Sequence, residues 1–546
     1  MKKNINKNIK YISFSIAILS NFFSISSCRS ADTDQDNTII GSGISGGIAA
    51  VKINLLGTEY ANSDKPAKVA SINQKGLNVD NSVQYYSVLV TPSSFISAEL
   101  APVTTLNNTA STSKNLNLIA AISGDPIAAG MKFRVIAYRQ SDGTYHTYQD
   151  YIVGQPAVPM MLDNGAAYNI IVYSYGTTNL PLISSGEQNN LSSATVNYDD
   201  NQRDFMYQKI PFTPTNSTNT LNITLRHKVA QITAIVNSGG MGNITNITGG
   251  LLTPHYSNGA VSLSSGTMSG RTTLSSGAAL SFLGLNTSTA TSTPVFVNAD
   301  TGGNATGSFS AAMTIAGITK TVSLPNSFKI TPENKSNLTI NLKACGAYIG
   351  PNTNPANYKE FMCQNLGATE GIDPFSPEAG NHGAKYQWGA QTGETGRYIS
   401  QANDQSSGGS ISGWNSTPNP NGSWSDTSKT SNDPCPSGYR VPTQQQWQAV
   451  IDYNNVERIG SWAEDENNYT TALYFINPSN IRTLMLPTAG YRDDTVGSLY
   501  YRGYNGFYWS SSVGTSNAYY LNFIRSGMYV GSSSRPSGLS VRCVAE

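Results

Sequence analysis

The stretch that determines the fold of the C-terminal part is Cys435-Pro-Ser-Gly-Tyr-Arg-Val-Pro-Thr-Gln-Gln-Gln-Trp447. Three further blocks follow in the order Leu486-Pro-Thr-Ala-Gly-Tyr-Arg492, Gly506-Phe-Tyr-Trp-Ser-Ser-Ser512 and Ser540-Val-Arg-Cys-Val544. A cysteine lies in the first block and another in the last, with short tyrosine-bearing segments between them. This pattern predicts a module that is closed by a disulfide and whose loops are available for contacts.

One helix is predicted within this module. Thr443 suits the N-cap and Gln446 the third helical position, which together make a capping-box pattern. In such a helix Trp447, Val450 and Ile451 share one face, and we expect that face to pack inward. The other large aromatic residues of the motifs are expected to fill the core rather than bind a ligand; they are Tyr386, Trp388, Tyr508 and Trp509.

The first 27 residues have the composition of a bacterial secretion signal. They contain four lysines, no acidic residue and an apolar run, 11–23, that is too short to span a membrane as a helix. The run leads to Ile25-Ser-Ser-Cys28, which resembles a lipobox, so Cys28 is predicted to become the lipidated first residue. An ordinary cleaved signal with an incidental cysteine is the alternative. Residues 28–48 are predicted to form a polar tether.

The composition excludes a nucleic-acid-binding protein. Charged residues make up only 12% of the chain, and the formal net charge is +1. Removal of residues 1–27 takes away four lysines and changes that charge to −3. A protein that binds nucleic acid normally carries a basic patch. Aromatic residues at 10% provide enough apolar surface for folded domains.

Four cysteines remain besides Cys28, and an even number in an exported chain indicates disulfides. Of the three connectivities, we expect Cys345–Cys363 and Cys435–Cys543, because the second pair joins the first and last blocks of the module. A zinc site is the alternative. It is disfavoured because the chain has no Cys-x-x-Cys motif and its four histidines are scattered. No metal and no cofactor are predicted.

The four C-terminal blocks resemble, in identity and order, those of the Fibrobacter succinogenes major paralogous domain. This resemblance implies a C-type lectin-like fold with mixed α and β structure for residues 344–546. The Glu-Pro-Asn and Trp-Asn-Asp signatures of sugar-binding C-type lectins are absent. The adjacent carboxylates Asp493 and Asp494 are therefore not assigned to a calcium site.

The chain before Cys345 consists almost entirely of predicted strands and turns. The segments 132–138 and 144–153 flank Ser141-Asp-Gly143, which is a strong hairpin signal. The alternating segment 221–236 predicts either two pairing strands or one long bent strand. With the lipobox, this half resembles the fimbrillin-like proteins of Bacteroidetes, which implies two β-sandwiches, 49–205 and 206–343. The predicted fold is thus mostly β, with the lectin-like domain last.

A tyrosine-rich stretch late in the module is the candidate binding surface. Tyrosine offers broad, stiff contact area at small entropic cost, and the interleaved Gly, Ser and Asn supply adaptable hydrogen bonds. The alternative is a set of exposed strand positions without a ligand. The predicted ligand-binding residues are Tyr491, Tyr500, Tyr501, Tyr504, Tyr519, Asn522, Arg525 and Tyr529.

These features predict a lipid-anchored protein exposed on the outer membrane that acts in adhesion or recognition, in a terminal or accessory fimbrial role. The expected partners are a surface glycan or protein and other fimbrial subunits. A structural scaffold or fimbrial-base lipoprotein without its own ligand is the main alternative. Two blocks, 386–389 and 440–447, are similar to those of formylglycine-generating oxidoreductases. They occur in the opposite order, and the reactive cysteine pair is missing, so no enzyme activity is predicted.

Overall fold

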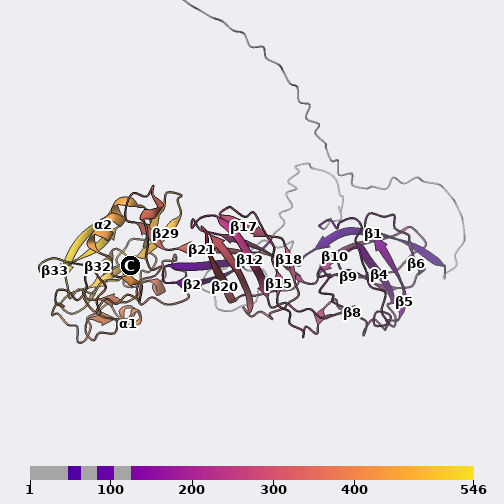
Figure 1. Cartoon of the computed structure of the whole chain (residues 1–546). Coiled ribbons are helices and arrows are strands. Elements are labelled where there is room, and N and C mark those ends of the chain that lie inside the picture. The colour runs from indigo at the N-terminus through magenta and orange to yellow at the C-terminus, as the bar shows by residue number, and fades with distance from the viewer. Residues whose placement is uncertain (1–46, 63–82, 104–124) are drawn as a thin grey trace, which may run out of the picture. The chain divides into compact units, whose positions relative to one another are not determined.

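The structure, a computed structural model, describes residues 47–62, 83–103 and 125–546 (Figure 1). The predicted signal segment 1–27, the lipidation site Cys28 and nearly all of the predicted tether lie outside the described residues. Strands dominate the described part, so the prediction of a mostly β fold is confirmed. The α-helices of that part are α1 (Gln401–Ser406) and α2 (Gln444–Tyr453). No helix among the described residues is long and apolar enough to cross a membrane.

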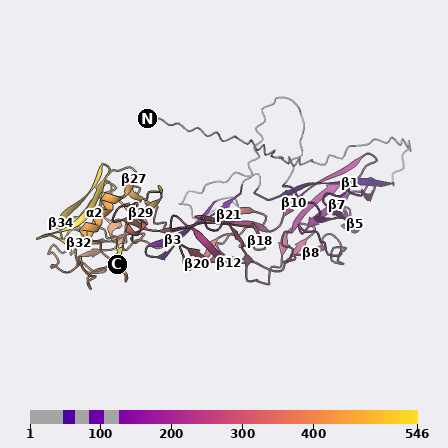
Figure 2. The same cartoon turned by 45° about the horizontal axis from the view of Figure 1, so that its top comes forward.

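A seven-stranded sheet forms the first folded region, and Figure 2 shows β1, β7 and β10 within it. Strands β1 and β10 run parallel, with Val51 opposite Asn219. The hairpin predicted around residues 141–143 is confirmed, because β4 and β5 pair antiparallel on either side of it. The strand order is β5 (Tyr145–Ile152), β4 (Lys132–Arg139), β7 (Tyr168–Ser174), β9 (Met206–Phe212), β10 (Asn219–His227), β1 (Ile48–Glu59) and β6 (Met160–Asp163).

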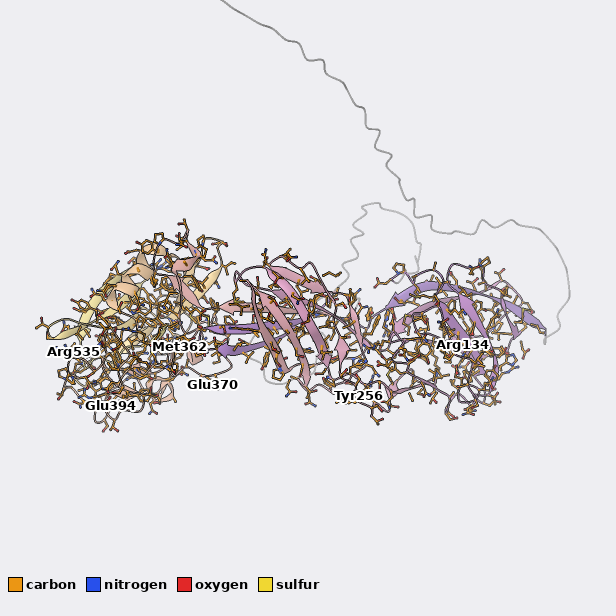
Figure 3. The ribbon with its side chains drawn as sticks, in the orientation of Figure 1. Arg134, Tyr256, Met362, Glu370, Glu394 and Arg535 are labelled. Carbon is orange, nitrogen blue, oxygen red and sulfur yellow. A yellow bond between two sulfur atoms is a disulfide. The ribbon has the colours of Figure 1, made fainter. Side chains whose placement is uncertain are left out.

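The core of this region is enclosed by its own sheet. One buried apolar cluster takes all its members from the seven strands, which means that the sheet curls around that cluster. A second cluster covers the other face, where the small sheet β14 (Met268–Ser269), β13 (Ala260–Ser262) and β8 (Thr195–Asn197) packs. The buried Arg134, labelled in Figure 3, donates to Asp150 Oδ1 at 2.7 Å and to Glu187 Oε1 at 3.2 Å.

The chain passes from the first sheet to the next at Lys228 and Val229. The two strands of the segment 221–236 do not pair with each other: β10 stays in the first sheet, whereas β11 (Ala230–Asn237) runs parallel to β21 (Lys335–Ala344). The expectation of a pairing or continuous strand was therefore wrong. Alternation of apolar residues shows that a segment is a strand but does not select its partner.

Two sheets that share one core form the second region. Buried residues of both contribute to it, for example Ile232 and Leu338 from one sheet and Phe309 and Leu324 from the other. In Figure 1 the indigo strand β2 lies in this region although it comes early in the chain. One sheet has the order β16 (Phe282–Leu283), β17 (Thr289–Ser292), β11, β21, β3 (Ser94–Pro102) and β2 (Gln84–Thr91), with β18 (Val295–Val297) on β11; the other has β15 (Ala278–Ala279), β12 (Ile244–Thr253), β19 (Gly307–Ile315) and β20 (Ile318–Phe328).

Strand pairing crosses the predicted boundary between residues 205 and 206. Strands β9 and β10 follow that boundary but complete the first sheet, and β2 and β3 precede it but belong to the second region. The division into 49–205, 206–343 and 344–546 stays a prediction.

The C-terminal module combines short sheets with the two helices. Helix α2 contacts β32, β33 and β34, and its Trp447 and Val450 are buried in the same cluster as Leu521 and Phe523. The remaining elements are β22 (Gly346–Tyr348), η1 (Pro355–Asn357), β23 (Tyr358–Glu360), η2 (Ala379–Asn381), β24 (Lys385–Tyr386), β25 (Tyr398–Ile399), β26 (Tyr439–Arg440), β27 (Asn455–Ile459), β28 (Ala472–Ile476), β29 (Arg482–Pro487), β30 (Ala489–Arg492), β31 (Leu499–Arg502), β32 (Gly506–Val513), β33 (Asn517–Ile524), β34 (Gly527–Ser534) and β35 (Val544–Ala545).

The predicted capping box of α2 is present. The Gln446 backbone N–H donates to Thr443 Oγ1 at 3.1 Å, and the Thr443 N–H donates to Gln446 Oε1 at 2.8 Å. The core positions predicted for the motif aromatics are also confirmed, since Tyr386, Trp388, Tyr508 and Trp509 are fully buried.

Both predicted disulfides are present, Cys345–Cys363 and Cys435–Cys543. The first bridges residues 18 positions apart, and the second bridges residues 108 positions apart. The second therefore closes nearly the whole of the motif-bearing stretch. The chain-entropy contribution of a disulfide grows with the length of the loop that it closes, from about 3 kcal/mol for a short loop to about 4.7 kcal/mol for one of roughly 100 residues.

We expect removal of the Cys435–Cys543 disulfide to destabilise the module more than removal of Cys345–Cys363. The C435A/C543A variant should lose about 1 to 2 kcal/mol more unfolding free energy than C345A/C363A, because it frees a longer loop. Guanidinium unfolding followed by tryptophan fluorescence measures this in the full chain, since all six tryptophans lie between residues 388 and 509. An equal or larger loss in C345A/C363A would contradict the expectation.

Candidate functional site

The hairpin of β30 and β31 has tyrosines on its exposed side and arginines on its buried side. Tyr491 lies opposite Tyr500 in this pair, and each strand ends in an arginine, Arg492 and Arg502. Both arginines are almost completely buried, whereas Tyr500 is exposed. In β30 this arrangement follows from strand geometry, because successive side chains point to opposite faces and Tyr491 precedes Arg492. In β31 Tyr500 and Arg502 are two residues apart, and regular alternation would put them on the same face, so the inward position of Arg502 requires the distortion at Tyr501.

A local distortion brings a second tyrosine of β31 to the exposed side. Strict alternation would place Tyr501 on the face opposite to Tyr500, but Tyr501 has a left-handed backbone with φ +59° and is 40% exposed. Its N–H donates to Glu464 Oε1 at 2.8 Å, and its carbonyl accepts the Asn505 N–H at 2.9 Å. A left-handed backbone costs an ordinary residue roughly 1–2 kcal/mol, and such strain is typical of functional sites.

Gly490, on the strand opposite Tyr501, is required by the same distortion. Its φ is +65°, and a Cβ atom there would lie 2.3 Å from the Tyr500 carbonyl oxygen. Glycine alone fits this contact without displacing the partner strand.

The buried side of the hairpin is held by the carboxylate of Asp404 in helix α1. Arg492 Nε donates to Asp404 Oδ1 at 2.8 Å, and an Arg502 guanidinium N–H donates to Asp404 Oδ2 at 2.5 Å. Both guanidinium groups also donate to the Asp404 backbone carbonyl, at 2.7 and 3.0 Å. Asp404 has no exposed surface, so these bonds are shielded from water and are charge-assisted.

Lys385 adds a third cation to this buried cluster. Its Nζ lies 3.6 Å from Asp404 Oδ2, and both side chains are fully buried. Burial would raise the pKa of Asp404, but attraction to Lys385, Arg502 and Arg492 outweighs it and lowers that pKa. Burial lowers the pKa of Lys385 to about 8, and repulsion from Arg502 and Arg492 acts in the same direction. The neighbouring His382 has a pKa well below its ordinary value, chiefly through burial, and is neutral at pH 7.

One face of the sheet β32–β33–β34 continues the aromatic side of the hairpin. Phe507 lies opposite Asn522, and Asn522 lies opposite Tyr529, so these three side chains share one face of the sheet. Tyr520 shares that face too, because it is two residues from Asn522 in β33. The opposite face carries Leu521 and packs against helix α2.

Ring contacts join the hairpin and the sheet into one patch, which we call the tyrosine surface. The ring centroid of Tyr491 lies 5.9 Å from Tyr500, 6.1 Å from Tyr501 and 5.0 Å from Phe507. The patch extends from Tyr501 to Tyr504 at 6.5 Å and from Phe507 to Tyr520 at 5.6 Å. The rings joined by these contacts are Tyr491, Tyr500, Tyr501, Tyr504, Phe507 and Tyr520. Tyr529 is added as a member because its pairing with Asn522 puts it on the same face of the sheet.

The structure brings most of the predicted contact residues together but separates Tyr519 from them. Tyr519 and Leu521 are two residues apart in β33, so their side chains point to the same face of the sheet. That face is turned to α2. Asn522 is fully buried beneath the patch, and its side-chain oxygen has no hydrogen-bond partner. Arg525 is exposed in the turn between β33 and β34.

Neither the Asp404 cluster nor Phe507 was predicted from the sequence. A signal for the cluster was available, because a Tyr-Arg pair occurs in each hairpin strand, at 491–492 and 501–502. Asp404 itself had no such signal, because it lies 88 residues from Arg492.

The carboxylate of Asp493 accepts the backbone N–H groups of Thr495 and Ser498, at 2.8 and 2.6 Å, and so shapes the loop after β30.

The buried Lys385 makes the stability of the module dependent on pH. Its folded-state pKa of about 8 is below the value of roughly 10.4 in an unfolded chain. The unfolded state therefore binds more protons between these values, and stability rises with pH in that window. We expect a gain of about 2 kcal/mol in unfolding free energy between pH of about 7.5 and about 9.5.

The K385M variant serves as the control for this prediction, since methionine fills a similar volume and does not titrate. Its stability should vary much less over the same pH range when unfolding is followed by tryptophan fluorescence. Equal slopes for the wild-type protein and K385M would contradict the assignment.

Comparison with protein families found one match. Residues 336–545 match the family model of the Fibrobacter succinogenes major domain. The match includes all four sequence blocks, both disulfides and the tyrosine surface. No curated protein matches the chain.

Comparison with solved structures found several proteins of low similarity. A candidate cell adhesion protein of Bacteroides fragilis NCTC 9343 is 11% identical with a TM-score of 0.30; 54% of this chain and 92% of that protein are covered. A candidate cell adhesion protein of Parabacteroides distasonis ATCC 8503 is 12% identical with a TM-score of 0.27 and coverage of 47% and 87%. A fimbrial assembly protein of the same strain is 9% identical with a TM-score of 0.25 and coverage of 39% and 88%.

At these scores the solved structures do not establish a shared fold, and the family match alone identifies a part of the chain. Residues 336–545 are a Fibrobacter succinogenes major domain.

Proposed function

We propose that this protein is a lipid-anchored adhesion or recognition protein of the cell surface and that it binds its ligand through the tyrosine surface. The observation that carries this proposal is the contiguous patch of exposed rings on the C-terminal domain. Tyr500, Tyr501, Tyr504 and Tyr529 are each between 39% and 51% exposed. Exposed aromatic residues that form one patch, rather than isolated positions, are typical of a contact site.

The way the patch is held supports binding further. The rings stand on strands whose opposite side is fixed by the buried Asp404 bonds to Arg492 and Arg502. A surface whose side chains are already ordered loses little conformational entropy when a ligand binds. Tyrosine in particular provides a large contact area with few rotatable bonds.

The Y501A/Y504A/Y529A variant tests the proposal. Beads that carry the mature full-length protein should lose adhesion to immobilised glycans or proteins by at least about tenfold, because each buried ring contributes roughly 1 kcal/mol or more. The fluorescence-detected unfolding of the variant should stay close to that of the wild-type protein, since the three side chains lie on the surface.

Tyr519→Ala is the matched control, because Tyr519 lies in the same domain but on the opposite face of the sheet. It should retain adhesion. Unchanged adhesion of the triple variant, or an equal loss in both variants, would sink the proposal.

Anchoring is proposed to occur through Cys28. Mass spectrometry of the mature protein should find residue 28 at the N-terminus with covalently attached acyl chains. Several acyl chains anchor firmly, since each buried methylene contributes about 0.8 kcal/mol. The C28A variant should appear in the soluble fraction, and membrane association of C28A with an unmodified N-terminus would contradict this anchor.

A further inference from the structure

The tyrosine surface is bordered by acidic side chains. Segment 464–466, Glu-Asp-Glu, runs beside β31: Glu464 Oε1 accepts the Tyr501 N–H at 2.8 Å, and the Asp465 N–H donates to the Arg502 carbonyl at 3.0 Å. Asp493 and Asp494 follow β30, and both are close enough to Tyr491 to contribute to its raised pKa, for which burial is the main cause. The carboxylates of Glu464, Asp493 and Asp494 thus lie beside the tyrosines of this surface.

Positive charge is scarce near these carboxylates. Arg492 and Arg502 point inward to Asp404, and Arg482 pairs with Glu457 at 2.6 Å. The sequence has no lysine after Lys429. Within residues 483–524, all of which the structure describes, the two arginines that occur are both buried. The exposed Arg525 lies beyond them, in the β33–β34 turn.

A buried hydrogen-bond acceptor lies on the same face. The side-chain amide of Asn522 donates to the Gly506 carbonyl at 3.3 Å, and its oxygen has no partner although the residue is fully buried. Because this oxygen has no exposed surface, it lies beneath the rings and does not contact a ligand; only the exposed rings and carboxylates do.

We propose that the tyrosine surface recognises a cationic segment of a partner protein, one that presents lysine or arginine side chains. This inference rests on the proposed binding function and specifies its ligand. A cation over a tyrosine ring is attracted by the ring's quadrupole, and a carboxylate at the edge of the ring pairs with the same cation. An anionic glycan or an anionic lipid surface is repelled by the carboxylates of Glu464, Asp493 and Asp494.

Direct binding to defined peptides tests the inference. The probes are a fluorescent peptide of alternating Lys and Ser, its Glu and Ser counterpart, and a neutral oligosaccharide, each titrated against the mature full-length protein. Only the cationic peptide should bind. Its affinity should fall at least about tenfold between about 0.05 M and about 0.5 M salt, because salt screens exposed charges.

The E464Q/D494N variant isolates the charge. The Glu464→Gln change keeps a side-chain oxygen that can accept the Tyr501 N–H, and among the described residues the Asp494 side chain has no hydrogen-bond or ion-pair partner to lose. We expect about a five- to tenfold loss of affinity for the cationic peptide. D452N removes one exposed charge from α2, on the other side of the sheet, and should bind as the wild-type protein does.

The outcomes separate this inference from the proposed function. Equal binding of the two peptides, salt-independent binding, equal effects of E464Q/D494N and D452N, or binding of only the oligosaccharide would each overturn the cationic ligand. The proposed function would still stand in those cases if Y501A/Y504A/Y529A lost adhesion and Tyr519→Ala did not. Cationic-peptide binding that is unaffected in the triple tyrosine variant would overturn the inference, because the site would lie elsewhere.

Discussion

The carboxylate of Asp404 is the interaction on which the C-terminal surface depends. It connects helix α1 to both strands of the β30–β31 hairpin through Arg492 and Arg502. Burial of three cations around one carboxylate is unfavourable unless hydrogen bonds compensate for the lost hydration of the charges. The guanidinium group of arginine can donate two such bonds in a fixed fork, whereas the ammonium group of lysine cannot. Lys385 at 3.6 Å is the less well satisfied partner, and its lowered pKa is the consequence.

This buried anchor determines what the exposed side can present. In a strand, fixing one side chain inward also fixes its neighbours outward, so the inward Arg492 places Tyr491 on the surface, and Tyr500 lies opposite Tyr491 on the same face. The left-handed residue Tyr501 then adds a ring that regular alternation would have turned inward. The strain at that position persists because Glu464 and Asn505 hold its backbone from both sides.

Local sequence patterns predicted the local elements of this fold. The capping box at Thr443 and Gln446, the hairpin at 141–143 and the two disulfides all follow from interactions between nearby residues or from the pairing of cysteines. Contacts distant in sequence were not predicted. Nothing within the segment 221–236 indicates that β10 pairs with a strand 168 residues earlier or that β11 belongs to another sheet.

In the candidate site, too, local features were predicted from the sequence and long-range contacts were not. Its tyrosines were predicted from composition, but their faces were not, because assigning them requires the register of β33 and β34. That register separates Tyr519 from Tyr520 and buries Asn522. Asp404 has no sequence pattern that marks it, since its role arises only when α1 meets the hairpin in three dimensions.

The acidic border of the tyrosine surface has a simpler explanation, namely that charge keeps exposed rings soluble. Solubility alone, however, places no demand on where each carboxylate lies. Here Glu464 is bonded to the backbone of Tyr501, the one tyrosine among the described residues with a left-handed conformation, and Asp493 orders the loop that follows Tyr491. Charges that only prevent aggregation would be expected on mobile side chains scattered over the domain. Carboxylates held beside particular rings, with both nearby arginines turned inward, favour a surface arranged to meet a cation.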